Sequence, residues 1–202
     1  MHLDLFAPQP QQNLLPYDGD VQDYGLVLNC TDASAYLDYF LQHLPWRPDQ
    51  VKLYGRQIQT ARQMVWYADQ ACNYAYSGVT RQALPWDSRL LQLKQQIERE
   101  TGEQFNSCLA NLYQDGTQGM GWHRDDDMGL APTTSIASLS LGATRKFVFR
   151  HLHTHEKVEI QLQHGQLILM KGVTQKYWQH ALMKSARVRQ PRINLTFRQF
   201  QF

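Results

Sequence analysis

The second half of the chain lacks helical periodicity, and this feature restricts the fold more than any other. From Phe105 onward, short stretches of β-type sequence are separated by turn residues such as Asp115-Gly116 and Lys171-Gly172. We expect strands at 105–113, 135–141, 146–151, 157–163, 166–170, 177–182 and 192–200. Many short strands in succession are typical of a jelly roll or a barrel.

Two amphipathic segments precede these strands. Thr31-Asp32 offers an N-cap to a helix whose apolar stripe runs over residues 36–44 and which Pro45 ends. Asp87 or Ser88 caps a second helix, and Gly102 closes it. The predicted fold class is therefore α+β and mainly β, with a jelly roll or barrel that flanking N-terminal helices buttress.

The length of 202 residues predicts one domain, at 21–202, preceded by an extended arm at 1–20 that contains three prolines. Three cysteines without a Cys-x-x-Cys pair argue against a disulfide framework and against a thiolate zinc site. The net charge of +2 is too small to indicate a nucleic-acid partner by itself. No apolar run approaches the roughly 18 residues of a membrane span, and no secretory signal is recognisable. We expect a monomeric, cytoplasmic protein with no membrane partner.

One short motif has the chemistry of a metal site. His123 and Asp125 are two residues apart, so in extended backbone both side chains point to the same side. His180 begins a later β-type segment and can supply a third ligand. Two histidines and one carboxylate are the ligands of non-haem iron(II) oxygenases, although zinc hydrolases also use them. A hydrogen-bonded His–Asp loop and a partly buried His180 are the alternatives without metal.

The last predicted strand favours iron and a dicarboxylate cosubstrate. Arg192, Asn194 and Arg198 share one face of this strand. Arginine is suited to bidentate capture of a planar carboxylate. Asn111 and Tyr113 form a matching pair on one face of the strand at 105–113. A half-exposed strand with a solvated polar face is the alternative.

Five segments together resemble the AlkB family of nucleic-acid dealkylating dioxygenases, in its DNA-repair branch. They are Asn111-Leu-Tyr113, Trp122-His-Arg-Asp-Asp-Asp127, Ile136-Ala-Ser-Leu-Ser-Leu-Gly142, Tyr177-Trp-Gln-His180 and Arg192-Ile-Asn-Leu-Thr-Phe-Arg198. The resemblance implies a double-stranded β-helix (jelly roll) at about 105–202 with iron(II) on His123, Asp125 and His180. It also implies that Arg192, Tyr113 and Asn194 hold the distal carboxylate of 2-oxoglutarate. Asn111 and Arg198 would lie near its iron-chelating end.

The same resemblance implies a nucleotide-recognition lid at about 50–80. Tyr74 would hydrogen-bond a flipped base, Tyr76 would stack on it, and Asp127 would accept a hydrogen bond from its exocyclic amine. Tyr54 would wedge between bases of a duplex, and Arg62 would bind substrate. Ala61 departs from the family, in which proline is common before this arginine. Packing of aromatic strand residues is the alternative for the two tyrosines of the lid.

The activity implied is oxidative dealkylation repair of 1-methyladenine and 3-methylcytosine in DNA by base flipping. Iron(II), O₂ and 2-oxoglutarate would be used, and succinate, CO₂ and an aldehyde released. The same chemistry on RNA and a catalytically silent jelly-roll module that binds nucleic acid are the alternatives. Basic clusters at 145–146, 150–157 and 184–189 are candidates for phosphate contacts, or else solvated loops. Alternating histidines at 151, 153 and 155 are interpreted as a polar loop.

Overall fold

The computed structural model describes residues 12–201 except 54–55, 72, 77–78 and 126–134, and it leaves the side chains at 50–58, 72–81 and 126–134 undescribed. The elements are, in chain order, β1 (Asp20–Leu26), α1 (Cys30–His43), β2 (Arg47–Leu53), β3 (Arg56–Ala68), β4 (Asn73–Tyr76), β5 (Val79–Gln82), α2 (Ser88–Thr101), β6 (Ser107–Tyr113), β7 (Met120–His123), β8 (Ile136–Gly142), β9 (Arg145–His151), β10 (Lys157–Leu162), β11 (Gln166–Lys171), α3 (Thr174–Tyr177), β12 (Trp178–Leu182) and β13 (Arg192–Arg198).

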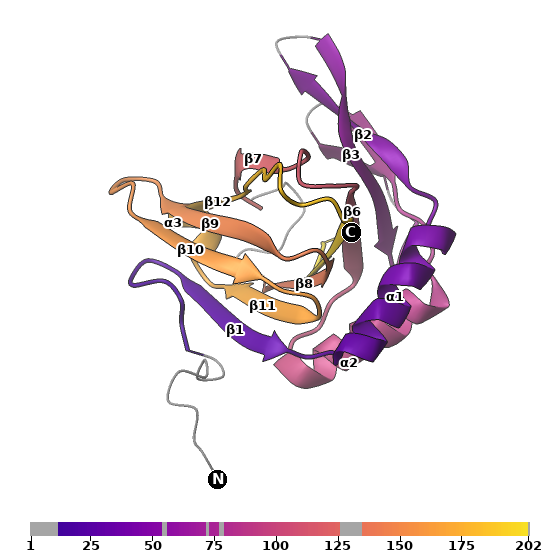
Figure 1. Cartoon of the computed structure of the whole chain (residues 1–202), viewed down its shortest axis with the longest axis horizontal. Helices are drawn as coiled ribbons and strands as arrows, with labels where there is room; N and C mark the ends of the chain where they lie inside the picture. The colour runs from indigo at the N-terminus through magenta and orange to yellow at the C-terminus, as the bar shows by residue number, and fades with distance from the viewer. Residues whose placement is uncertain (1–11, 54–55, 72, 77–78, 126–134, 202) are drawn as a thin grey trace.

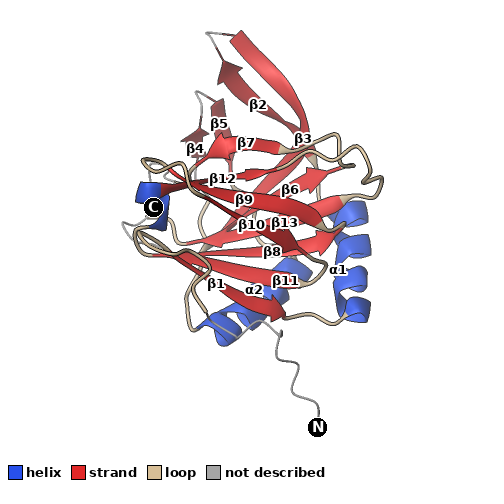
Figure 2. Ribbon diagram, turned by 60° about the vertical axis from the view of Figure 1, so that its left-hand side comes forward, coloured by secondary structure: helices blue, strands red, loops and turns tan. Residues whose placement is uncertain are grey.

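Two antiparallel sheets face each other, as Figure 1 shows. The larger sheet has the strand order β1-β11-β8-β13-β6-β3-β2, and the smaller has the order β10-β9-β12-β7. Apart from the hairpins β2–β3 and β9–β10, strands that are neighbours in these two sheets are not consecutive in the chain, which is the pattern of a jelly roll. Helices α1 and α2 cover the outer face of the larger sheet (Figure 2). The predicted fold class, a mainly β jelly roll buttressed by helices, is confirmed.

The core has two main layers. One lies under the helices, where Phe40, Leu90, Leu93 and Ile97 pack against the outer face of the larger sheet. The other lies between the sheets and includes Phe149, which is fully buried. Both faces of β8 and β13 are covered, so nearly every residue of these strands is buried. The sequence of β13 still alternates, with its apolar residues in the core under the helices and its polar residues in the space between the sheets.

The ends of the helices follow capping chemistry, with one correction. The first helix begins two residues earlier than predicted, because the side chain of Asn29, and not of Thr31 or Asp32, accepts a hydrogen bond from the Asp32 amide at 2.9 Å. The second helix begins as predicted, with the Asp87 carboxylate accepting from the amides of the first turn. Gly102 ends that helix at a φ of 72°, which favours glycine.

Several elements were not predicted or have different bounds. Strands β1 and β7 were missed, and Tyr177 ends the short helix α3 instead of beginning a strand. The region at 50–80 contains β2 and the long strand β3, which pair as one hairpin, and a second hairpin of β4 and β5. The sequence also indicates turns at Gly55 and Gly78, and both glycines lie outside the described residues.

Part of the predicted arm packs on the domain. Leu15 is buried, and the Trp178 indole donates to the carbonyl of Tyr17 at 2.9 Å. Asn13 forms an isolated β-bridge to Gln22 of β1. Residues 1–11 lie outside the described residues. Among the helices that the structure describes, none is long and apolar enough to cross a membrane.

Candidate metal and cosubstrate site

A cavity between the two sheets collects nearly all of the predicted site residues that the structure describes. Its walls come from β3 and β6 on one side, β13 in the middle, and β7 and β12 on the other. The lining includes Arg62, Asn111, Tyr113, His123, Asp125, His180, Arg192, Asn194 and Arg198. Residues that are up to 136 positions apart in the chain therefore meet in one place because strands that are distant in sequence pair in the sheets.

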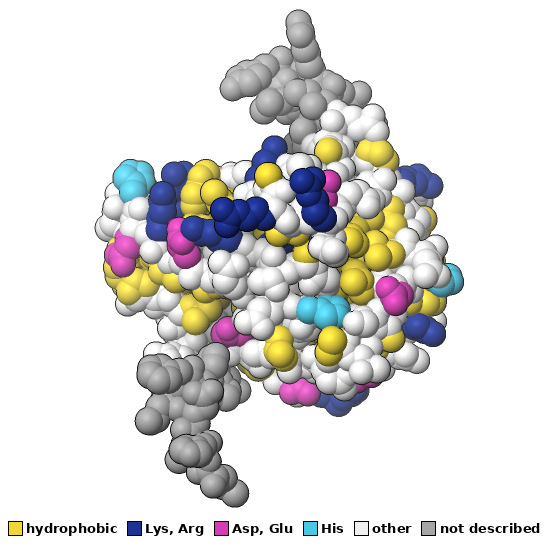
Figure 3. Space-filling model, viewed as in Figure 1, with side chains coloured by type: hydrophobic (Ala, Val, Ile, Leu, Met, Phe, Trp, Pro, Cys, Tyr) yellow, Lys and Arg dark blue, Asp and Glu magenta, His cyan; other side chains and the backbone are white. Residues whose placement is uncertain are grey.

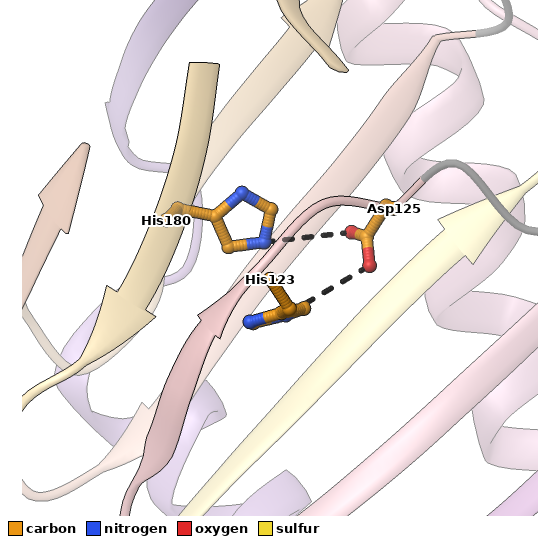
Figure 4. A group of neighbouring side chains, drawn as sticks. All are labelled: His123, Asp125 and His180. Carbon is orange, nitrogen blue, oxygen red and sulfur yellow. Dashed lines mark ion pairs between the residues drawn. The ribbon is translucent and has the colours of Figure 1, made fainter. Parts of the chain in front are cut away.

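Three candidate metal ligands converge inside this cavity (Figure 4). His123 ends β7 and faces His180 of β12 across the sheet as a direct pair. Asp125 lies two residues beyond His123, and its carboxylate oxygens are 3.9 Å from Nε2 of His123 and 3.8 Å from Nε2 of His180. One potential ligand atom from each residue lies within 4.8 Å of the others. This donor set fits a single cation with coordination positions left open.

Neighbouring groups orient the ligands. Nδ1 of His123 lies 2.8 Å from the carbonyl of Gly121, so a proton on Nδ1 leaves the Nε2 lone pair directed at the metal position. The backbone amide of Asp125 donates to the side-chain oxygen of Gln175 in α3 at 2.8 Å. The ring of Phe147 stacks on His180, with centroids 5.2 Å apart. Gln175 was not singled out in the sequence, because nothing in the pattern predicted α3.

The electrostatics keep the ligands in the protonation states that a metal requires. Burial raises the pKa of Asp125, but the Arg198 guanidinium, with smaller effects of His180 and His123, outweighs it and holds this pKa below its ordinary value. Arg198 donates to Asp125 at 2.8 Å. Burial, followed by the neighbouring His123, lowers the pKa of His180 to about 3, so its imidazole is neutral at physiological pH.

A buried cation stands at another wall of the cavity. Arg192 is 1% exposed, and its Nη2 donates to Asn194 at 2.7 Å and to Ser140 at 2.9 Å. Its guanidinium lies 5.7 Å from the ring centroid of Tyr113, the residue opposite it on β6. Within the described residues, no carboxylate pairs with Arg192. Burial lowers the pKa of Arg192 to about 10, which is the sign of a charge held without an anion.

Two further candidate cosubstrate residues, Asn194 and Asn111, lie between Arg192 and Arg198 in the pairing of β13 with β6. Asn194 faces Asn111 directly across the two strands. The Asn194 amide accepts from Arg192 and donates to Thr196 at 2.8 Å. Asn111 is 6% exposed, and its side-chain oxygen has no hydrogen-bond partner in this structure. A buried orphan polar atom beside an unpaired cation is the mark of a site built for a polar ligand.

The residues expected at the substrate end are only partly visible. Arg62 of β3 lines the cavity, where it pairs with Asp49 and donates to Met120 Sδ at 3.0 Å. Tyr74 and Tyr76 lie on β4, and their side chains are not described. Tyr54 and Asp127 lie outside the described residues. Asp49 is a cavity residue that sequence reasoning missed, because a single aspartate in a β-type stretch gives no signal.

Two expectations about basic and histidine clusters are wrong in part. Arg145 is 1% exposed and donates to the carbonyls of Asp115, Gln118 and Met183, so it ties loops together and does not face a phosphate. His151 is buried beside Trp178, and its Nδ1 accepts from the amide of Thr154 at 3.1 Å. It is part of the packing and not of a polar loop.

Comparison with known proteins decides between iron and zinc. The model of the 2OG-Fe(II) oxygenase superfamily matches residues 26–198. The DNA oxidative demethylase ALKBH2 of Mus musculus is 39% identical over 200 residues, which cover 94% of this chain and 84% of that protein. The alpha-ketoglutarate-dependent dioxygenase alkB homolog 3 of Bos taurus is 40% identical over 177 residues, 83% of this chain and 61% of that protein. The chain belongs to the AlkB family of this superfamily.

The solved structure of OsALKBH1 has the same fold, with a TM-score of 0.55 at 15% identity over 92% of this chain and 99% of that one. Membership of the AlkB family makes the chain an iron(II)- and 2-oxoglutarate-dependent dioxygenase, and not a zinc hydrolase or a silent binding module. The predicted cofactors are thereby confirmed. The triad of His123, Asp125 and His180 has the donor set that iron(II) requires in such enzymes.

Proposed function

We propose that this AlkB dioxygenase removes methyl groups from 1-methyladenine and 3-methylcytosine in DNA. One observation carries the proposal: a single cavity joins a His–Asp–His triad to a buried arginine that no carboxylate of the described residues pairs with. The names of relatives such as DNA oxidative demethylase ALKBH2 support the substrate class. Succinate, CO₂ and an aldehyde would be the other products.

The cosubstrate roles follow from the chemistry of the cavity wall. Arg192 would bind the distal carboxylate of 2-oxoglutarate, since its positive charge is buried and Asn194 fixes its orientation. Tyr113, directly across the sheet, would donate its hydroxyl to the same carboxylate. Asn111, with its unpartnered amide oxygen, and Arg198, which contacts Asp125, would lie near the chelating end.

Bound iron(II), with O₂ and 2-oxoglutarate, supplies the oxidising power that hydroxylates the N-methyl carbon, and the hydroxymethyl group then leaves as formaldehyde. The chain holds the three ligands ready for this metal. Arg198 keeps Asp125 ionised, and burial keeps His180 neutral, so neither ligand must lose a proton at physiological pH. Met64, Trp66 and Leu109 give the cavity an apolar lining, which would exclude water around the reacting carbon.

The roles of the residues at the substrate end are proposed from the resemblance to the AlkB family. Tyr74 and Tyr76 on the β4–β5 hairpin would contact the flipped base, and Asp127 would accept from its exocyclic amine. Arg62, on the cavity wall, would contact the base or its sugar. Tyr54, which follows β2 in the chain, would fill the gap that the extruded base leaves in a duplex.

A basic face supports a nucleic-acid partner. Figure 3 shows lysine and arginine side chains gathered on the face that carries β7, β9 and β12. Arg124, Lys184, Arg187 and Arg189 are exposed. Cations on such a face would neutralise backbone phosphates, so binding would weaken steeply as salt increases. A monomeric, cytoplasmic protein stays the prediction made from the sequence.

The experiment is the loss of a methyl mass from single- and double-stranded oligonucleotides that carry 1-methyladenine or 3-methylcytosine. Iron(II) and 2-oxoglutarate are supplied and then each is omitted. We expect demethylation only with both present, and matched RNA strands test RNA as the second candidate substrate. Intact methyl groups on every DNA strand would refute the proposal. Tyr54→Ala should impair duplex substrates far more than single strands if Tyr54 is a wedge.

A further inference from the structure

A buried acidic residue, Asp49, stands in the cavity without a role in metal or cosubstrate binding. It belongs to β2 and is 2% exposed. Its carboxylate pairs with the guanidinium of Arg62 on β3, and both residues line the cavity. A buried carboxylate costs free energy unless a partner compensates it, so a carboxylate kept at this position calls for an explanation.

The hairpin is irregular at this pair. Arg47 faces Met64 and Pro48 faces Gln63, but the next pair joins Gln50 to Gln59. One residue of β2, Asp49, therefore lies opposite the three residues from Thr60 to Arg62. The Thr60 hydroxyl donates to the carbonyl of Arg62 at 3.0 Å and closes this bulge. Bulges of this kind redirect a side chain beside active sites.

The bulge also marks a boundary along the hairpin. The hairpin of β2 and β3 projects beyond the edge of the two sheets in Figures 1 and 2. Further along β3, Met64 and Trp66 lie on the same face of the strand as Arg62, and both also line the cavity. The Asp49–Arg62 pair thus sits where the projecting hairpin joins the cavity wall.

The charge of Arg62 is directed at the cavity. Its Nη1 donates to Met120 Sδ at 3.0 Å, and a thioether is a weak acceptor that leaves the cationic charge uncancelled. Desolvation lowers the pKa of Arg62, but the nearby Tyr113 hydroxyl and the Asp49 carboxylate outweigh it, and the guanidinium stays charged. The carboxylate that pairs with this charge is that of Asp49, whereas Asp125 contacts Arg198.

The charge of the proposed substrate makes this balance important. A methyl group on N1 of adenine or N3 of cytosine gives the ring a positive charge, whereas a methyl group on N3 of thymine replaces a proton and leaves the ring neutral. Without Asp49, the cavity wall would present an uncompensated cation to a cationic base. Like charges a few ångströms apart in a partly desolvated site repel strongly.

We propose that Asp49 is a specificity-determining residue, whose carboxylate cancels the charge of Arg62 and thereby admits cationic alkylated bases. The inference rests on the proposed function, because that function supplies the cationic base. It deepens that function by giving a second acidic group, distant in sequence from Asp127, a role in selecting the lesion by its charge.

The test measures binding of the metal-free protein to matched oligonucleotides that carry 3-methylcytosine or 3-methylthymine. Asp49→Asn should weaken binding of the cationic lesion about tenfold to a hundredfold and of the neutral lesion much less. Arg62→Gln should shift the ratio of the two dissociation constants the other way, towards the cationic lesion. The double variant should return the ratio to near its wild-type value. Asp38→Asn, on the exposed surface of α1, removes the same charge as a control.

A second readout separates electrostatics from structural damage. Asp49→Asn adds net positive charge to a cavity that binds an anionic cosubstrate, so the affinity for 2-oxoglutarate should stay the same or increase. Structural damage to the hairpin would instead weaken the binding of both the oligonucleotide and 2-oxoglutarate. Three results would overturn the proposal. They are an equal loss of affinity for the two lesions, a ratio of dissociation constants that moves in the same direction for Asp49→Asn and Arg62→Gln, and weaker 2-oxoglutarate binding by Asp49→Asn. Because binding is measured without iron, these outcomes are independent of the demethylation assay.

Discussion

Arg192 offers the most direct test of the cosubstrate site. In the protein without cosubstrate its guanidinium is buried, and burial lowers the pKa of Arg192 from its ordinary value to about 10. This difference corresponds to roughly 3 kcal/mol for holding the charge in the folded state. The penalty is present below pH 10 and disappears as the pH increases beyond 10, because the charge is lost first in the folded chain and then in the unfolded chain.

Replacement of Arg192 by Met should therefore have two unequal effects. The free energy of unfolding without cosubstrate should change by less than about 2 kcal/mol, because relief of the buried charge offsets the loss of the bonds to Asn194 and Ser140. The affinity for 2-oxoglutarate should fall about a hundredfold to ten-thousandfold, since two charge-assisted hydrogen bonds of roughly 1.5–3 kcal/mol each are removed.

Thermal unfolding with and without 2-oxoglutarate and manganese(II) in place of iron measures both effects. The wild-type protein should be stabilised by 2-oxoglutarate, and the Arg192→Met protein should not be at the same concentration. Arg192→Lys is the matched control, which keeps the charge but loses the bidentate geometry and should give an intermediate affinity. An unchanged affinity in the Met variant would refute the assignment of this arginine.

Three further predictions concern the metal ligands and the scaffold. His123→Ala should reduce formaldehyde release to background while circular dichroism stays that of the wild type, and undiminished release would exclude His123 as a ligand. Gln175→Ala should weaken manganese(II) binding about tenfold to a hundredfold by freeing the amide of Asp125, whereas Gln175→Glu, which keeps an acceptor oxygen, should bind near normally. Asp87→Ala should lower the free energy of unfolding by about 1 kcal/mol in urea titrations through loss of the α2 cap, with no change in cosubstrate affinity.

The local features of this protein were accessible from the sequence because they depend on neighbours in the chain. The cap at Asp87 and the glycine that ends α2 follow from the needs of helix termini, and the alternation along β13 follows from the two-residue period of a strand. His123 and Asp125 were recognisable as a pair for the same reason. The third ligand was placed by analogy to a motif, because spacing alone does not join residues 125 and 180.

Tertiary structure decided the rest. Pairing of β7 with β12 brings His180 opposite His123, and the regular pairing of β13 with β6 brings Arg192 opposite Tyr113. Burial lowers the pKa of Arg192, which no carboxylate in the described part of the chain pairs with, and it lowers the pKa of His180. Neither effect can be computed from a chain whose packing is unknown. Asp49 and Gln175 have no signature in the sequence at all. Their places in the site exist only because a bulge in one hairpin and a four-residue helix carry them to the wall of the cavity.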